Sequence, residues 1–586
     1  NVSRYVIQDA DASTLVFDVT DGVALKRMET SLNGTELSFS APASSTLQEY
    51  VAVKPSQAKT PKVVGEVKNQ NLHALEQQDM IIIAPTAFVE QAERLAEAHR
   101  TMDGLNVQVI TPEAIYNEFS SGTPDATAYR RFMKMFYDRK TSDLDAPKYL
   151  LLFGDGSYDN RQLTATWKAV DMSNMLLTYQ TDNSLDAYSY VIDDYFGFLD
   201  DADNAKSVNQ KKVNIGIGRF PVRTIAQAKN AVEKVISYME NKEVGGWKNN
   251  ICFLADDGSN SDDYTQAHML EADTLADHLA LKHPEFLYHK LYFDAYKKEQ
   301  SGGQGDFPDV RSNLQKLFKD GLLLLNYTGH GNTTSLSDEQ IVSMTDITQA
   351  SYTRLPVWVT STCDFTRFDD IATSAGEEVF LNAKSGGIAL FTTVRVAWRP
   401  YNAYIDSYLL HSLFDKNNGK RRTLGDALKA MKCGLVANYG SSANQVKMGF
   451  CLIGDPALKL AYPEYNVKVT AINGKSVTGE SIPFKALEKI TVEGEILNTA
   501  GVLASDFTGV INPTIKDSKV MVTCLDNNNT GEEPFTFTDY PNTLFIGNDS
   551  VQKGKFSFTF TVPKDISYSG LQGKMNLYAV DTQTGI

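Results

Sequence analysis

Two residues of this chain, His330 and Cys363, carry the side chains that cysteine-based catalysis uses. His330 stands between Gly329 and Gly331 in the segment LLLLNYTGHGN, and Cys363 ends the segment VWVTSTC 33 residues later. A cysteine thiolate attacks a carbonyl carbon, and a neighbouring imidazole takes the thiol proton and later passes it to a leaving amine. The pair therefore indicates a nucleophile and a general base.

Each of these residues also has a plain structural interpretation. A histidine in a glycine turn is usually a turn residue, and a lone cysteine after a strand is usually a small buried hydrophobe. Both residues follow apolar strands, so together they indicate a catalytic site more strongly than either residue alone. The remaining histidines lie mainly in helical or polar stretches and are expected at surface or structural positions; they are His73, His99, His268, His278, His283, His289 and His411.

The glycines beside His330 favour the catalytic interpretation. Residues without side chains let a substrate backbone approach, and the N–H groups of Gly331 and Cys363 are candidates for an oxyanion hole.

A third residue is expected from the segment ICFLADD, whose acids are Asp256 and Asp257. Either carboxylate could orient the imidazole, although an acidic cluster before a helix is more often a cap or a solvated turn. The sequence leaves the choice between the two open.

These residues need a rigid base, and the surrounding pattern predicts one. Apolar strands alternate with amphipathic helices over about 380 residues, which is typical of a mostly parallel sheet covered on both faces. In such sheets, functional groups project from loops beyond the carboxyl ends of the strands. The predicted strands cover residues 80–85, 105–110, 149–155, 213–221, 251–257, 322–329, 357–363 and 387–393.

The pattern divides the chain into four expected parts. Residues 1–77 read as a β-rich segment that ends an N-terminal β-domain, and residues 461–586 as an immunoglobulin-like β-sandwich. Between them lie two α/β subdomains, residues 78–225 and the catalytic residues 226–460.

Composition excludes several classes of protein. The 586 residues are 42% hydrophobic with a net charge of −16, values typical of a soluble globular protein and unfavourable for nucleic-acid binding. No apolar run approaches the roughly 20 residues of a membrane-spanning helix. Five cysteines without a CxxC pair argue against a disulfide framework or zinc cluster and leave at least one free thiol. A first residue other than Met favours a fragment or processed form.

No cofactor is required by these residues, and no metal ligands are assigned. Two Asp-rich stretches, residues 153–161 and 198–210, offer oxygen ligands compatible with a structural Ca²⁺. Neither has the full EF-hand spacing, so structural turns are the favoured interpretation.

The chain resembles the gingipain-like cysteine peptidases, which are related in architecture to the caspases. The resemblance runs in order through LLFGD, DDYFGFLDD, IGRFPV, FLADDG, NYTGHG, Cys363, GIALFTT and LIGDPAL. It covers about residues 78–460 and ends where that family also carries an immunoglobulin-like domain.

The resemblance implies roles for particular residues. His330 matches the family's general base, Cys363 its nucleophile, and the N–H groups of Gly331 and Cys363 its oxyanion hole. Asp256 is the first choice for the third catalytic residue and Asp257 the alternative. The residues that match the substrate pocket of arginine-specific members are Asp262 and Trp398, but a shorter loop before Asp262 argues against trypsin-like specificity.

The flanking β regions are similar to one branch of the family, the sortases and signal peptidases of the type IX secretion system. That branch acts at the bacterial cell surface in association with the outer membrane. It removes the C-terminal signal domain of secreted cargo and joins the new carboxyl end to anionic lipopolysaccharide, with an outer-membrane β-barrel shuttle protein and other attachment subunits as partners. Alternatives are a secreted gingipain-like protease and an inactive assembly or adhesion module. The sequence does not decide between hydrolysis and transfer.

Overall fold

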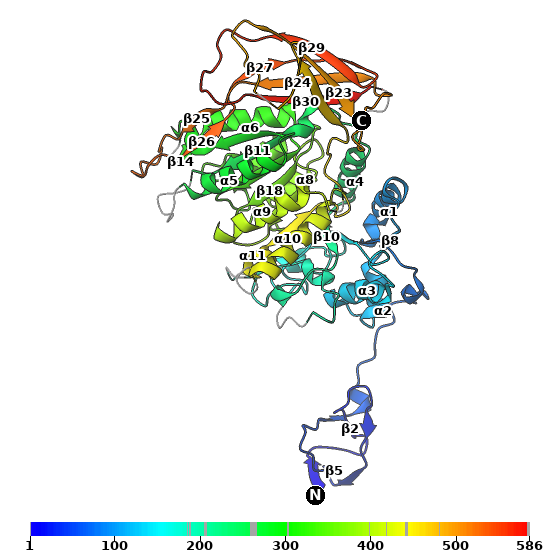
Figure 1. Cartoon of the computed structure of the whole chain (residues 1–586). Coiled ribbons are helices and arrows are strands. Elements are labelled where there is room, and N and C mark those ends of the chain that lie inside the picture. The colour runs from blue at the N-terminus through cyan, green and yellow to red at the C-terminus, as the bar shows by residue number, and fades with distance from the viewer. Residues whose placement is uncertain are drawn as a thin grey trace. The chain divides into compact units, whose positions relative to one another are not determined.

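The computed structural model describes residues 2–582 except positions 185, 187–188, 204–207, 258–265, 302–303, 398, 418, 440–443 and 480. The chain divides into two compact units, Asn1–Gln70 and Asn71–Ile586, which are drawn in Figure 1.

The first unit is a small β structure. Its strands form two three-stranded sheets, ordered β1-β5-β4 and β3-β2-β6, with antiparallel pairing throughout. Its few buried hydrophobic residues include Val16, Leu37 and Phe39. The strands are β1 (Val2–Ile7), β2 (Leu15–Asp18), β3 (Lys26–Arg27), β4 (Thr30–Asn33), β5 (Glu36–Pro42) and β6 (Tyr50–Val53).

The second unit is built around one ten-stranded sheet, ordered β12-β11-β15-β18-β19-β20-β10-β9-β7-β8. The first five strands in this order are β12 (Leu287–Tyr292), β11 (Asn250–Ala255), β15 (Leu324–Thr328), β18 (Val357–Ser361) and β19 (Ala389–Thr393). The other five are β20 (Phe450–Ile453), β10 (Gly216–Phe220), β9 (Tyr149–Phe153), β7 (Met80–Ile83) and β8 (Val107–Ile110). The mixed α/β architecture predicted from strand and helix alternation is confirmed.

The sheet consists of two parallel halves that run in opposite directions. All neighbours pair in parallel except β19 and β20, which are antiparallel. Strand β20 comes late in the chain but pairs with β10 of the early half. The carboxyl ends of the two halves therefore face opposite edges, and His330 and Cys363 belong to one of them.

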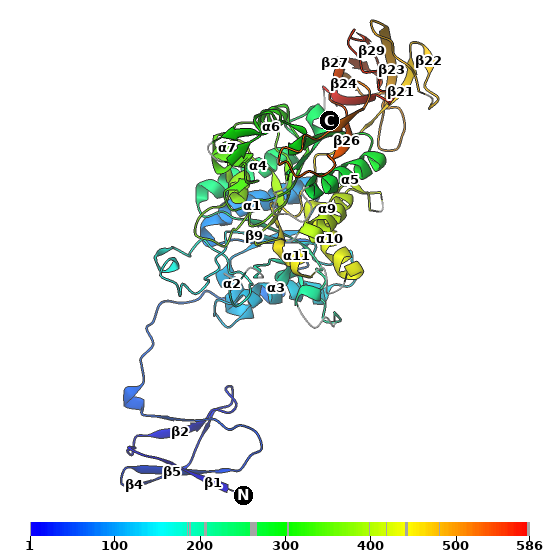
Figure 2. The same cartoon turned by 90° about the vertical axis from the view of Figure 1, so that its left-hand side faces the viewer.

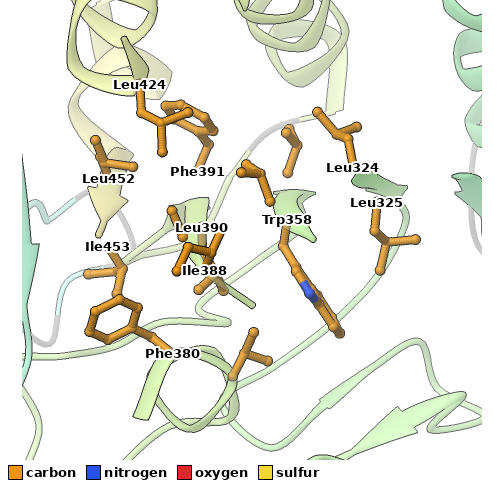
Figure 3. Packing of buried hydrophobic residues seen from close by; sticks show 14 of the residues in the cluster. Leu324, Leu325, Trp358, Phe380, Ile388, Leu390, Phe391, Leu424, Leu452 and Ile453 are labelled. Atoms are coloured by element: carbon orange, nitrogen blue, oxygen red, sulfur yellow. The ribbon is translucent and has the colours of Figure 1, made fainter. Parts of the chain in front are cut away.

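The strands near the centre of the sheet are buried along their whole length because both faces are covered. Every residue of β15, β18 and β19 is buried. Figure 3 shows how residues in register share a face: Leu325, Trp358 and Leu390 lie on one side of the strands, and Leu324 and Phe391 on the other. This packing makes a rigid base for the loops at the sheet edge.

Helices cover both faces of this sheet (Figure 2). Local sequence sets their ends: α4 starts with a capping box between Thr224 and Gln227, and α1 continues into a π-helical turn that stops at Gly104, with φ 68°. The helices are α1 (Val89–Ala98), α2 (Pro112–Phe119), α3 (Ala126–Arg139), α4 (Ile225–Met239), α5 (Ala267–Lys282), α6 (Pro308–Asp320), α7 (Met344–Gln349), α8 (Ala375–Leu381), α9 (Arg399–Phe414), α10 (Leu424–Tyr439) and α11 (Asn444–Gly449). Two short antiparallel ribbons are formed by β13 (Glu299–Ser301) with β14 (Gln304–Asp306) and by β16 (Ser335–Leu336) with β17 (Val342–Ser343).

The C-terminal part is an antiparallel β region with its own core. It contains β21 (Asn466–Ile472), β22 (Lys475–Ser476), β23 (Lys489–Leu497), β24 (Gly509–Lys516), β27 (Thr543–Ile546), β28 (Asp549–Gln552), β29 (Lys555–Thr561) and β30 (Lys574–Asp581). Alternating residues of β29, Phe556, Phe558 and Phe560, point into that core. The strands β25 (Val520–Thr523) and β26 (Thr536–Asp539) form a separate hairpin that is not part of this sheet.

Two further expectations concern the whole chain. All five cysteines are free, where their number and spacing predicted at least one free thiol and argued against a disulfide framework. Among the described residues, no helix has both the length and the apolar content that crossing a membrane requires.

Candidate active site

The residues predicted to do chemistry lie at one edge of the sheet, at the ends of three neighbouring strands. In the order β11-β15-β18, Thr328 of β15 pairs with both Ala255 and Ser361. Asp256 follows Ala255 directly, while His330 and Cys363 each stand two residues beyond that paired row. Neighbouring strands are about 4.8 Å apart, so the fold places His330 between the strand ends that carry Asp256 and Cys363.

The backbone of His330 is held from both sides. Its N–H donates a hydrogen bond to Asp256 Oδ2 at 2.9 Å. Its carbonyl oxygen accepts from the Tyr327 hydroxyl at 2.6 Å and from the Ser337 N–H at 2.8 Å. Three hydrogen bonds on the two peptide groups that flank its Cα fix the direction in which the His330 side chain leaves the main chain. The carboxylate bonded to its main chain is Asp256 and not Asp257.

The imidazole of His330 packs against a second histidine that the sequence gave no reason to select. The ring of His268 meets it edge to face, with centroids 5.4 Å apart and an interplanar angle of 85°. His268 is buried in the first turn of α5, the helix that follows β11. A helix that follows a strand begins at the strand's carboxyl edge, and that topology is the signal that points to His268.

Cys363 is half-buried at the end of β18. Its Sγ donates to the carbonyl oxygen of Ala397 at 3.4 Å, and burial raises the pKa of the thiol. The chain turns away immediately afterwards, because Asp364 adopts a left-handed conformation with φ 50°. The cysteine is therefore held in a sharp turn as a neutral thiol, and a base is needed to generate the thiolate.

The glycines around His330 have packing reasons. A Cβ on Gly329 would lie 2.4 Å from Asp256 Cβ and 2.5 Å from the Tyr327 hydroxyl oxygen, and one on Gly331 would lie 2.5 Å from Thr362 Oγ1. The sequence suggested that these glycines leave room for a substrate; in the structure, neighbouring side chains occupy much of that room.

The structure describes both residues whose N–H groups are the predicted oxyanion donors. Among the hydrogen bonds of the described residues, none is donated by the N–H of Gly331 or of Cys363. Both residues are partly exposed at the sheet edge, so their N–H groups are available to a substrate oxyanion.

A second group of charges lies behind Asp256. Asp256, Asp257 and Glu339 each offer a carboxylate oxygen within 4.8 Å of the others. The pKa of Asp256 is raised mainly by burial and further by the neighbouring carboxylate of Asp257. The pKa of Asp257 is raised mainly by burial and further by the carboxylate of Glu339. The Lys298 ammonium bonds Asp257 at 3.1 Å and Glu339 at 2.8 Å. These oxygens suit a hard cation, but an ammonium already occupies the space between two of them.

Asp406, which the sequence did not single out, braces the two strands that carry His330 and Cys363. Its buried carboxylate on α9 accepts hydrogen bonds from Asn326 at 3.1 Å, from Thr328 at 3.4 Å and from Ser361. Burial raises its pKa to about 6. Nothing in the local sequence of a helix some 45 residues downstream of Ser361 points to this contact.

Several predicted residues fall elsewhere. Asp262 and Trp398, the expected pocket residues, lie outside the described part of the chain. In the first Asp-rich stretch, Asp155 is ion-paired with Arg223, 68 positions away, and Asp159 accepts from the N–H groups of Leu163 and Thr164. In the second, Asp200 accepts from the N–H of Ala202. The bonds of Asp159 and Asp200 are those of structural turns, and a Ca²⁺ at either stretch stays a prediction.

The fold and the site together define a class of protein. An imidazole and a thiol at equivalent ends of adjacent parallel strands, with open backbone donors beside them, form the arrangement that nucleophilic acyl transfer uses. The chain belongs to peptidase family C25, whose sequence profile matches residues 73–461. The predicted family resemblance is confirmed, and membership makes a cysteine peptidase of the gingipain type the expected activity.

Known structures agree with this assignment. The dimeric latent form of PorU from Porphyromonas gingivalis is 30% identical over the whole of this chain, with a TM-score of 0.54. This chain spans about half of PorU, 49% of its length. The arginine-specific cysteine proteinase gingipain R is 18% identical over 86% of this chain and 98% of its own, with a TM-score of 0.50, and shares the fold. No curated protein matches at a significant level.

Proposed function

We propose that this chain is a cysteine endopeptidase and transpeptidase of the PorU type, with Cys363 as nucleophile and His330 as general base. The observation that carries the proposal is the register of β15 and β18, which places both residues two positions beyond the same pair, Thr328 and Ser361. Membership of family C25 supports the same chemistry.

The reaction proceeds through a thioester. His330 removes the Cys363 thiol proton, the thiolate adds to a peptide carbonyl carbon, and the N–H groups of Gly331 and Cys363 bind the oxyanion. Collapse breaks the C–N bond, and the imidazolium returns its proton to the leaving amine. Water or an amine then attacks the thioester carbonyl carbon while His330 takes its proton; collapse breaks the C–S bond, and the imidazolium returns that proton to the Cys363 sulfur. The thiol, the imidazole and the attacking water or amine supply every proton and electron pair, so the proposed reaction needs no cofactor.

Asp256 is the proposed acidic member of the site, acting on the main chain of His330. Its raised pKa does not prevent this role, because either oxygen of a carboxyl group, charged or neutral, can accept from an N–H. Asp262 and Trp398 remain the proposed pocket residues.

The proposed substrates follow the likeness to PorU. They are the C-terminal signal domains of secreted cargo, with anionic lipopolysaccharide as the amine-bearing acceptor. The proposed location is the bacterial cell surface at the outer membrane, with a β-barrel shuttle protein and other attachment subunits as partners.

The test uses an electrophilic probe and a cargo protein. Iodoacetamide should label Cys363 faster than the other half-buried thiol, Cys433, and the excess should disappear in His330→Ala. Mass spectrometry of cargo incubated with the protein and an amine acceptor should show a cut carboxyl end joined to the amine, with no product from Cys363→Ala. A cut but unjoined product would indicate a hydrolytic protease instead. Unselective labelling together with uncut cargo would indicate an inactive module.

A further inference from the structure

The hairpin β25–β26 comes from the C-terminal β region but packs into the α/β core. Its buried residues Cys524 and Phe537 belong to the same hydrophobic cluster as β11 and β15, and not to the cluster that fills the C-terminal sheet. The ring of Phe537 lies 4.7 Å from that of Tyr292, and Lys290 Nζ donates to the Thr538 carbonyl at 3.1 Å. Figures 1 and 2 both show β26 beside α5.

The loop after β25 is fastened to the α/β part by several hydrogen bonds, most of them to Asp294. The N–H groups of Asp526 and Asn527 donate to Asp294 at 3.0 and 2.8 Å, and the Asn527 side-chain amide donates at 2.8 Å. The Leu525 N–H donates to the Asp294 carbonyl at 2.8 Å. These hydrogen bonds fix the position of the next residue, Asn528.

Asn528 reaches the charges behind Asp256. Its side-chain N–H donates to Asp257 Oδ2 at 2.9 Å, and its Oδ1 accepts from Lys298 Nζ at 3.1 Å. The same ammonium bonds Asp257 at 3.1 Å and Glu339 at 2.8 Å. One amide therefore bridges a buried carboxylate and its partly buried ammonium partner, and an amide can donate and accept at once.

The position of Asp257 matters because Asp256 adjoins it. Asp256 accepts the His330 N–H at 2.9 Å, so a displacement of Asp257 is transmitted through one peptide to the carboxylate that holds His330. Lys298 bonds only two of these three carboxylates, Asp257 and Glu339, and a group that fixes their geometry without adding charge keeps the mutual repulsion of the three low.

We propose that Asn528 is a positioning residue of the candidate active site. It fixes the pair Asp257 and Lys298, and through them Asp256 and the main chain of His330. The C-terminal β region thereby contributes a side chain to the arrangement of the site. The inference rests on the proposed function, because it matters only if His330 activates Cys363.

The experiment measures the rate of Cys363 alkylation by iodoacetamide from pH 5.5 to 9 in the full chain. The variants are Asn528→Ala, which removes the bridge, and Asn528→Asp, which keeps the shape but cannot donate to Asp257. The matched control is Asn529→Gly: Asn529 is exposed on the same loop with φ 52°, a conformation that glycine also adopts. Melting temperatures show whether each variant is folded.

Asn528→Ala should lower the rate about tenfold at every pH, the factor expected for a lost hydrogen bond to a charged group. Asn528→Asp should be slower still near pH 8 and should approach Asn528→Ala as the pH falls and the carboxylates protonate. Asn529→Gly should match the wild type. A variant with only a structural role would change the melting temperature without this dependence on pH.

Two results would contradict the inference, and they are distinguishable. If both Asn528 variants react at the wild-type rate while His330→Ala reacts slowly, Asn528 positions nothing and the proposed function stands. If wild-type Cys363 reacts no faster than Cys433 and is indifferent to His330→Ala, the proposed function fails and the inference fails with it.

Discussion

At the scale of single residues, close packing around His330 leaves no room for a side chain at Gly329. Asp256 Cβ and the Tyr327 hydroxyl oxygen lie 2.4 and 2.5 Å from where a Cβ would be. Both side chains bond the His330 main chain, so a Cβ at position 329 would displace the two groups that hold His330 in place. The glycine is thus required by the site.

Gly329→Ala should therefore abolish the labelling of Cys363 that depends on His330 and should destabilise the fold by about 1 to 3 kcal/mol, the usual cost of overpacking. Labelling kinetics and urea unfolding measure the two effects. Gly449→Ala is the control, since a Cβ there meets nothing within 4 Å. Wild-type labelling in Gly329→Ala would show that Asp256 can move without disturbing His330.

Asp406 predicts a specific dependence of stability on pH. Burial raises its pKa to about 6 from 3.8, so folding favours the protonated carboxyl. Its contribution to stability is fully present below pH 3.8 and is lost as the pH rises through about 6. The unfolding free energy of the wild type should therefore fall relative to Asp406→Asn by up to about 3 kcal/mol between pH 4 and 7.

Urea unfolding of both proteins across this range makes the comparison, because every other titration is common to the two. If the difference in unfolding free energy between the wild type and Asp406→Asn stayed constant with pH, the raised pKa of Asp406 would be contradicted.

At the scale of elements, a buried histidine joins the end of α1 to the loop after β20. His99 is fully buried, with Nδ1 2.8 Å from Asp103 and Nε2 2.7 Å from Asp455. Burial alone lowers the pKa of His99, but Asp455 and Asp103 outweigh it and raise the value to about 10. The pair Asp455 and His99 links segments 356 positions apart in the chain.

His99→Gln should cost about 3 to 5 kcal/mol at pH 7, because it leaves a buried carboxylate without its charge partner. The stabilisation of the wild type by charged His99 is complete below pH 6.5 and is lost as the pH rises through about 10. The wild type and His99→Gln should therefore converge in stability at high pH. Thermal unfolding at pH 7 and at pH 10.5 tests this. Asp103→Asn, which removes a half-exposed partner, should cost less.

At the scale of the whole molecule, the N-terminal residues form a unit of their own, whereas the C-terminal β region shares a core with the α/β part. Residues up to Gln70 form a compact unit with its own small core. The C-terminal β region instead places Cys524 and Phe537 in the α/β core and Asn528 beside Asp257.

A chain that starts at residue 71 should keep the melting behaviour and the Cys363 labelling of the full chain. A chain that stops at residue 461 should lose both, because it exposes the apolar surface that Cys524 and Phe537 cover. Calorimetry and labelling of the two truncated chains make the comparison. A stable and reactive chain ending at 461 would show that the hairpin contributes nothing to the site.

Much of this structure could be predicted from local pattern. Apolar strands alternating with amphipathic helices predicted the covered α/β sheet, and His330 and Cys363 were selectable because each reactive residue follows a buried strand. Other features could not be predicted. The opposite directions of the two sheet halves depend on β20 pairing with β10, a contact between segments more than 200 residues apart. His268 looked like any helical histidine, and Asp406 like any helical acid.

The sequence by itself determined the class of the protein: which strands are buried, which reactive residues stand at their ends, and the order of motifs that places the chain in family C25. Those properties are written in short segments, since the period of the apolar residues and the position of a glycine or cysteine depend on near neighbours. Only the tertiary structure decided which groups support the reactive pair. The hydrogen bond from the His330 N–H to Asp256, the contact with the His268 ring, the bonds of Asp406 and the proposed role of Asn528 all depend on contacts between segments that are far apart in the sequence. Such contacts depend on strand order and on the return of the chain from its C-terminal region, which no local spacing encodes.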